Sequence, residues 1–102
     1  MAISDLEYQI RILVTLNNNV INFPDGSFRY TDSYNLNDLH ATMQSRGCGM
    51  DKSRLRVLLE KTHDRKLIDG REGKEQNQVN SKGEFKINAE GRNFIRGRMD
   101  LN

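Results

Sequence analysis

Apolar residues recur with helical spacing at the start of the chain. Tyr8, Ile12 and Leu16 follow one another at intervals of four and form one stripe. A second stripe on nearly the opposite side consists of Leu6, Ile10, Leu13 and Val14. Ser4 and Glu7 match a capping box, in which the serine hydroxyl accepts a backbone N–H at the helix start. The pattern therefore predicts a helix from about residue 5 to residue 16 that is apolar on two faces.

The next segment reads as a hairpin followed by a second helix. Residues 20–23 and 28–31 are short runs of strand-forming residues, separated by Pro24, Asp25, Gly26 and Ser27, which suit a turn. Asp32 or Ser33 is expected to cap the second helix. The apolar positions of that helix include Leu36, Leu39, Ala41 and Met43. The glycines at 47 and 49 end it.

A third helix begins near Asp51, its expected N-cap. Its inward residues cluster within about 60° on a helical wheel, and they are Leu55, Leu58, Leu59 and Thr62. A polar span from 69 to 83 separates this helix from Phe85-Lys86-Ile87, which alternates as a half-buried strand does. Asn88 is expected to cap a short last helix, from residue 89 to about 98.

Length and composition place broad limits on the chain. At 102 residues, of which 35% are apolar, we expect one domain spanning residues 1–102. No run approaches the roughly 18 apolar residues of a membrane helix, so no membrane partner is expected. The first residues lack the pattern of a secretory signal. The single cysteine, Cys48, has no partner for an internal disulfide, which favours a cytoplasmic location.

Charge is distributed unevenly along the chain. Residues 1–45 carry two basic and five acidic residues, whereas residues 46–102 carry fourteen basic and nine acidic ones. The second half, with a net charge of +5, therefore favours an anionic partner. Because nine acids are interleaved there, the charge alone supports nucleic-acid binding only weakly.

The order helix, strand, helix, helix, strand, strand and closing helix resembles the winged helix-turn-helix family. The residues that carry the resemblance are Leu36 to Leu39, Leu55 to Ile68 and Phe85 to Arg92. The resemblance covers nearly the whole chain. It implies an α+β fold: a three-helix core, a β-hairpin wing and a short C-terminal helix.

The resemblance also implies that the third helix enters the major groove of double-stranded DNA. The candidate contacts on this helix are Lys52, Ser53, Arg54, Arg56, Val57 and Lys61. Arginine can bond guanine through two hydrogen bonds, and a valine fits against a thymine methyl. For Val57, packing against the hairpin of residues 20–31 remains the alternative. Because Glu60 and Asp64 follow, only the first two turns are expected to approach DNA.

Further basic residues are candidates for phosphate contacts. Arg46 and Lys52 lie near the start of the third helix, where a phosphate is favoured. Arg71, Lys74 and Lys82 fall on the expected wing. A solubilising surface is the alternative for these three, since Glu72, Glu75 and Glu84 lie among them.

The stripe of the first helix at Tyr8, Ile12 and Leu16 suggests a homodimer interface. The last helix would contribute Phe94, Ile95 and Met99. Terminal helices pair in this way in many winged-helix regulators, and two-fold dimers suit palindromic sites. The alternative is that the last helix packs on this stripe within one chain.

Catalytic and metal-binding patterns are weak. His40 and His63 do not fall in a cluster with ligand spacing, and Cys48 has no second cysteine to resolve an oxidised form. We therefore expect a non-enzyme without a cofactor or metal. The hypothesis is a transcriptional regulator that binds double-stranded DNA. The main alternative is a winged-helix module that binds another protein, and an RNA-binding role is a third.

Overall fold

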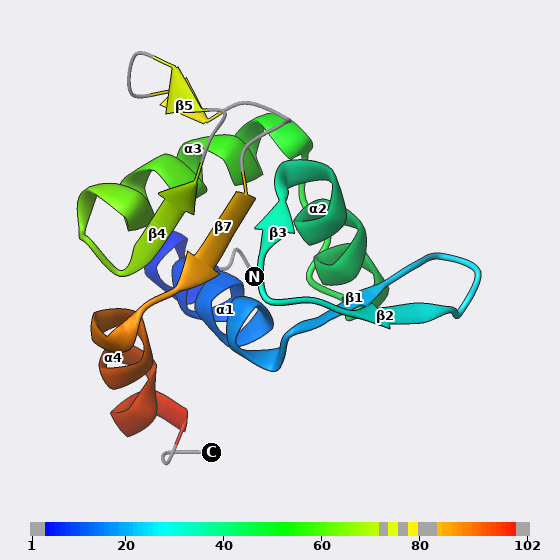
Figure 1. The fold of residues 1–102 in the computed structure, drawn as a ribbon, viewed down its shortest axis with the longest axis horizontal. Helices are drawn as coiled ribbons and strands as arrows, with labels where there is room; N and C mark the ends of the chain where they lie inside the picture. Colours follow the sequence, from blue (N-terminus) through cyan, green and yellow to red (C-terminus); the bar gives the residue numbers. More distant parts are fainter. Residues whose placement is uncertain (1–3, 72–73, 76–77, 80–83, 100–102) are drawn as a thin grey trace.

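Four helices and several short antiparallel strands form a small α+β fold (Figure 1). The computed structural model describes residues 4–71, 74–75, 78–79 and 84–99, with side chains for residues 4–70 and 84–97. The first half of the fold contains α1 (Asp5–Asn18), β1 (Val20–Asn22), β2 (Phe28–Tyr30), β3 (Tyr34–Asn35) and α2 (Leu36–Ser45). The second half contains α3 (Lys52–Asp64), β4 (Ile68–Arg71), β5 (Lys74–Glu75), β6 (Gln78–Val79), β7 (Glu84–Ile87) and α4 (Ala89–Met99).

The central sheet joins three strands that are distant in the sequence. β7 lies between β3 and β4 and is antiparallel to both. Phe85 and Ile87 of β7 are buried, whereas the residues between and before them are exposed. This alternation confirms the half-buried strand predicted there. Because α1 packs against β7, the two buried side chains of that strand lie between the sheet and the helices.

All four helices contribute to one hydrophobic core. α3 supplies the buried side chains of Leu55, Leu58 and Leu59, which confirms the inward face predicted for it. Thr62 is buried beside them, and its hydroxyl donates to the backbone oxygen of Leu58 at 2.7 Å. Within the described part of the chain, no helix combines the length and apolar character needed to cross a bilayer.

The stripe of α1 that contains Ile12 and Leu16 belongs to this core, which corrects the expected dimer interface. Ile12 and Leu16 are 0% and 1% exposed within a single chain, and Ile95 of α4 is 1% exposed. α4 packs directly on α1. These three side chains therefore have no surface left for a second copy, and the alternative of packing within one chain is the one observed. Of the other residues expected at that interface, Tyr8 and Phe94 are half-buried. The side chain of Met99 lies outside the described residues.

Two of the predicted helix caps are confirmed and one is wrong. The Ser4 hydroxyl and the Asn88 side-chain oxygen each accept a backbone N–H at the start of α1 and α4, at 3.1 and 2.8 Å. α2 is capped by Asn35, whose side-chain oxygen accepts an N–H at 2.7 Å, and not by Asp32 or Ser33. The reason is that β3 pairs with β7, which keeps the chain extended as far as Asn35.

Candidate nucleic-acid interface

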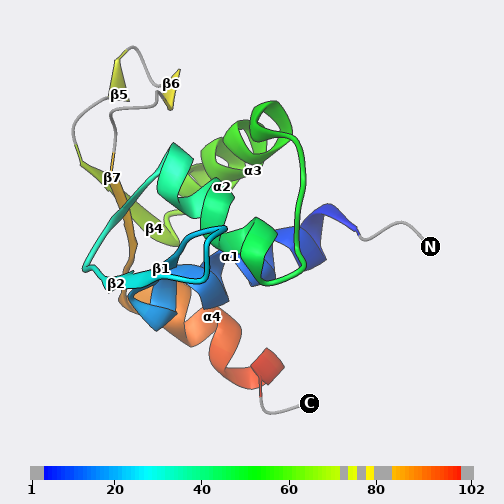
Figure 2. The same cartoon turned by 90° about the vertical axis from the view of Figure 1, so that its right-hand side faces the viewer.

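α3 is covered along one side and open along the other. Its inner side contacts α1 and α2, and it is also approached by β4 of the central sheet and by β6 of the separate β5–β6 pair. Figure 2 shows the helix at an edge of the fold, with α1 below it and the β5–β6 hairpin on the other side. A buried inner side fixes the helix in place, so the exposed side is a rigid surface.

Two adjacent pairs of residues near the beginning of α3 form one strip of its exposed surface. Lys52, Ser53, Arg56 and Val57 are all exposed, and we refer to them as the outer strip. Val57 is 47% exposed. Packing against the β1–β2 hairpin therefore does not bury this side chain, and nearly half of it is open to a partner. In the described part of the chain, neither Lys52 nor Arg56 forms an ion pair.

Arg54 and Lys61 point to a different side of α3, toward the start of α1. The guanidinium Nη2 of Arg54 lies 2.6 Å from Oδ1 of Asp5, and Lys61 Nζ lies 3.7 Å from Oδ2 of the same carboxylate. The guanidinium also lies 5.3 Å from the centre of the Tyr8 ring, close enough for a cation–π contact. The structure therefore separates these two cations from the outer strip and offsets their charge.

Asp5 and Tyr8 were not identified as part of the site from the sequence. Asp5 is 49 residues from Arg54 along the chain, so no helical or strand spacing connects them. The contact exists only because α1 and α3 pack side by side. Both members of the Asp5–Arg54 pair are about half exposed, so the pair contributes at most about 1 kcal/mol to stability. Its main consequence is electrostatic, at the edge of the candidate interface.

Arg46 lies away from the start of α3. With the amide oxygen of Asn18 turned toward it, the Arg46 guanidinium donates to that oxygen, with Nη2 at 3.3 Å. Asn18 is the last residue of α1, whereas Asp5 beside Arg54 is its first. Arg46 therefore lies at the end of α1 that is opposite Asp5 and Arg54, and the phosphate contacts expected of Arg46 and Lys52 stay predictions.

The expected wing is described only in part. The backbone of β5 and β6 forms an antiparallel pair, and β6 approaches α3. A hairpin thus lies next to the proposed reading helix, as the sequence suggested. The side chains of Arg71 and Lys74, and Lys82 as a whole, lie outside the described residues.

The connection from α2 to α3 is held by a histidine. His40 Nε2 lies 2.9 Å from the backbone oxygen of Met50, two residues before α3 begins. Asp51 occupies the N-cap position that was predicted, but its side chain makes no capping hydrogen bond. His40 thus has a positioning contact on the segment that leads into the outer strip.

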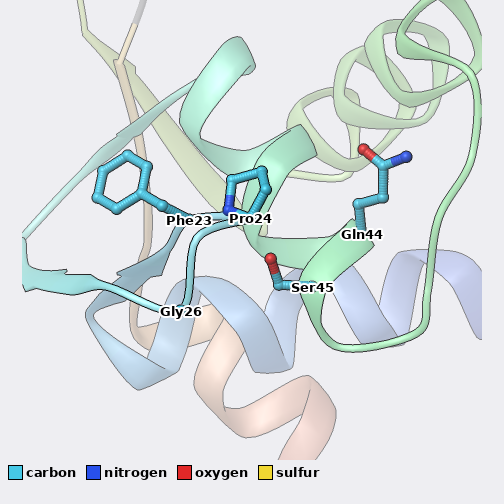
Figure 3. A pocket seen from close by; sticks show the side chains of 5 residues that line it. All are labelled: Phe23, Pro24, Gly26, Gln44 and Ser45. Carbon is cyan, nitrogen blue, oxygen red and sulfur yellow. The ribbon is translucent and has the colours of Figure 1, made fainter.

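A separate hollow lies between the tip of the β1–β2 hairpin and the end of α2. Figure 3 shows its lining side chains, Phe23, Pro24, Gly26, Gln44 and Ser45. None of these five carries a charge, so the hollow offers no ionised group for holding an ion or transferring a proton.

Comparison of the chain with protein-family models, with curated proteins and with solved structures finds no match. The outer strip and the fold around it are therefore the basis on which a function is proposed.

Proposed function

We propose that the chain is a winged-helix protein that binds double-stranded DNA through α3 and acts as a transcriptional regulator. The arrangement of the elements supports this fold family. α1, β3, α2, α3, β4 and β7 follow one another in the expected order, and β7 lies between β3 and β4. The β1–β2 hairpin is an addition between α1 and β3.

The outer strip is the observation that carries the proposal. Its members offer the chemistry that a base edge and a phosphate require, on a helix fixed by its buried side. Arg56 is suited to guanine, Ser53 to several bases and Val57 to a thymine methyl. Lys52, in the first turn, is suited to a backbone phosphate near the helix N-terminus. Asp64 is exposed at the far end of α3, so the contact is limited to its first two turns.

Binding of the full chain to random duplex DNA at increasing salt tests the proposal directly. A steep fall of log affinity with log salt concentration is expected, because phosphate contacts release counterions. No detectable binding at low salt would overturn the DNA-binding role.

Removing the two cations of the outer strip, Lys52 and Arg56, should weaken DNA binding by about tenfold or more at low salt. In the double variant Lys52→Ala/Arg56→Ala, the salt slope should also be less steep by about 1 to 2 units. The matched control is Lys86→Ala/Arg96→Ala, which removes two exposed cations from β7 and α4. Fluorescence anisotropy of a labelled duplex measures both. Equal losses in the two variants would mean that α3 is not the reader.

Neutralising Asp5 should strengthen DNA binding. The substitution Asp5→Asn removes the carboxylate that offsets Arg54 and Lys61 beside the outer strip. We expect a roughly two- to fivefold rise in affinity at low salt that disappears as salt increases, because exposed charges are screened. Asp32→Asn is the control, since it changes the net charge equally at an exposed residue between β2 and β3. An equal rise in both would indicate an effect of net charge alone.

A protein-binding winged helix remains the second candidate. It is favoured by the two exposed aromatic side chains of β2, Phe28 at 60% and Tyr30 at 77% exposure. A chain that binds no duplex at low salt but retains a specific protein contact through this strand would support it.

A further inference from the structure

The β1–β2 hairpin has an inner face that is packed and an outer face that is not. Ile21 and Arg29 are paired across the two strands and face α2, where Ile21 is fully buried and Arg29 lies 3.5 Å from Asp38. On the outer face, Phe28 and Tyr30 are 60% and 77% exposed. Their rings touch edge to face, with centroids 5.8 Å apart. The two aromatic side chains of β2 are thus directed away from the core of their own chain.

The two edges of the hairpin also differ. The outer edge of β1 is closed, because the N–H and carbonyl oxygen of Val20 bond the Tyr34 hydroxyl at 2.7 and 2.6 Å, and the N–H of Asn22 bonds the Thr42 hydroxyl at 3.0 Å. In an antiparallel pair, residues that bond the partner strand alternate with residues that face outward. The N–H of Thr31 donates to the carbonyl oxygen of Asn19, and the N–H of Phe23 donates to the carbonyl oxygen of Ser27, at 2.9 Å each. Residues 27 and 31 therefore face β1.

This alternation leaves the edge of β2 open. Since residues 27, 29 and 31 face β1, the N–H and carbonyl groups of Phe28 and Tyr30 point outward. Among the described residues, no hydrogen bond to these outward groups is found. An open strand edge is a template for pairing with another strand. Here it coincides with the exposed aromatic face.

We propose that this edge pairs with the same edge of a second copy of the chain. The two β2 strands would run antiparallel about a two-fold axis through Arg29. Phe28 of each copy then lies opposite Tyr30 of the other, and both pairs are of the hydrogen-bonded type. All four outward groups of each strand are satisfied in this register. The result is one four-stranded sheet across the two hairpins.

The side chains on both faces are compatible with this pairing. On the outer face, each Phe28 ring meets the Tyr30 ring of the other copy, and aromatic pairs across strands are stabilising. On the inner face, the two Arg29 side chains would be close together. Each already has Asp38 at 3.5 Å, so the charges around the axis alternate in sign and repulsion is offset.

The available area indicates a reversible dimer. The two aromatic side chains still expose on the order of 250 Å² per copy, given the 150–250 Å² that such residues bury. A stable interface buries about 800 Å² per partner. The rings alone supply about a third of this, so association is expected to depend strongly on concentration.

This dimer surface is separate from the proposed DNA-binding surface, because α2 lies between the hairpin and α3 (Figures 1 and 2).

Sedimentation velocity of the full chain should show its mass rising from 11.8 kDa toward twice that value as concentration increases. Phe28→Ser/Tyr30→Ser should raise the dimer dissociation constant at least tenfold. Leu6→Ser, which removes another exposed apolar side chain from α1, should leave it unchanged. Circular dichroism verifies that both variants are folded.

A cross-link tests the register. In the proposed register, residue 29 of one copy lies opposite residue 29 of the other in a non-hydrogen-bonded pair. The Cα atoms of such a pair are about 4.5 Å apart, which is within the range of a disulfide. In a Cys48→Ser background, Arg29→Cys should therefore form a disulfide dimer under mild oxidation. Asp32→Cys, which lies far from the axis, should not. Equal cross-linking of both would overturn the register.

Two other outcomes would overturn the proposal. One is a chain that stays monomeric at every concentration. This includes a monomer whose exposed Tyr30 ring binds a single-stranded oligonucleotide. The other is a dimer that is unaffected by Phe28→Ser/Tyr30→Ser.

Discussion

Replacing Gly91 with alanine is expected to destabilise the chain by about 3 kcal/mol, because the new side chain would overpack a rigid junction. Gly91 is buried in the first turn of α4. A Cβ at this position would overlap the carbonyl oxygen of Leu67 and lie 2.7 Å from Cγ1 of Ile87. The Leu67 carbonyl cannot move away easily, since it also accepts the N–H of Asn88 at 3.3 Å. Urea denaturation measures the loss, and Tm should fall by roughly 15 °C.

The same substitution at Gly97 is the matched control. Gly97 lies in the same helix, and an added Cβ there meets nothing within 4 Å. Gly97→Ala should therefore stabilise the chain by up to about 1 kcal/mol, because alanine has the higher helix propensity. If Gly91→Ala is as stable as the original chain, α4 does not pack against Leu67 as described.

The helices and their inward faces were predictable because they depend on local spacing. The inward residues of α3 repeat with the helical period, and Leu55, Leu58 and Leu59 are buried as that period indicates. The strand around Phe85 was predictable for the same reason, since alternation marks a half-buried strand. Both patterns are complete within about ten residues of sequence.

Contacts between distant segments were not predictable. β3 is only two residues long, and its pairing with β7 joins Tyr34 to Phe85. Without that pairing, Asp32 and Ser33 are as good as Asn35 as helix caps. The ion pairs of Asp5 with α3 were missed for the same reason. The set of α3 residues proposed to contact DNA is therefore smaller than the set expected from the sequence, since Arg54 and Lys61 face α1.

The apolar stripe on α1 illustrates a further limit of patterns. Periodicity indicates that Ile12 and Leu16 are to be covered, but it does not indicate by what. A second copy and the chain's own α4 would satisfy the stripe equally, and the structure has α4 on it. In β2 the pattern suggests burial where the structure has exposure. Phe28 and Tyr30 are strand-forming aromatic residues, and only the pairing of β2 with β1 reveals that both side chains face solvent.

Replacing Tyr34 with phenylalanine should cost about 2 kcal/mol, because it leaves buried backbone groups without their partner. The Tyr34 side chain is fully buried, and its hydroxyl lies 2.6 Å from the carbonyl oxygen of Val20 and 3.0 Å from that of Thr15. It also accepts the N–H of Val20. Amide hydrogen exchange at Val20 should accelerate. Tyr30→Phe, at an exposed ring, should change stability by less than about 0.5 kcal/mol.

The cost of Tyr34→Phe should also depend on pH. Burial raises the pKa of Tyr34 above its ordinary value of 10.0, although the Val20 hydrogen bond and the charge of Arg46 act in the opposite direction. Because the folded chain holds this proton more tightly than the unfolded chain, the contribution to stability is complete below pH 10. It is lost as the pH rises through the pKa of the folded state. The difference in unfolding free energy between the original chain and Tyr34→Phe should therefore shrink above pH 10, as urea denaturation at pH values on both sides measures. A difference that stays constant across that range would mean that the hydroxyl is not buried between α1 and β1.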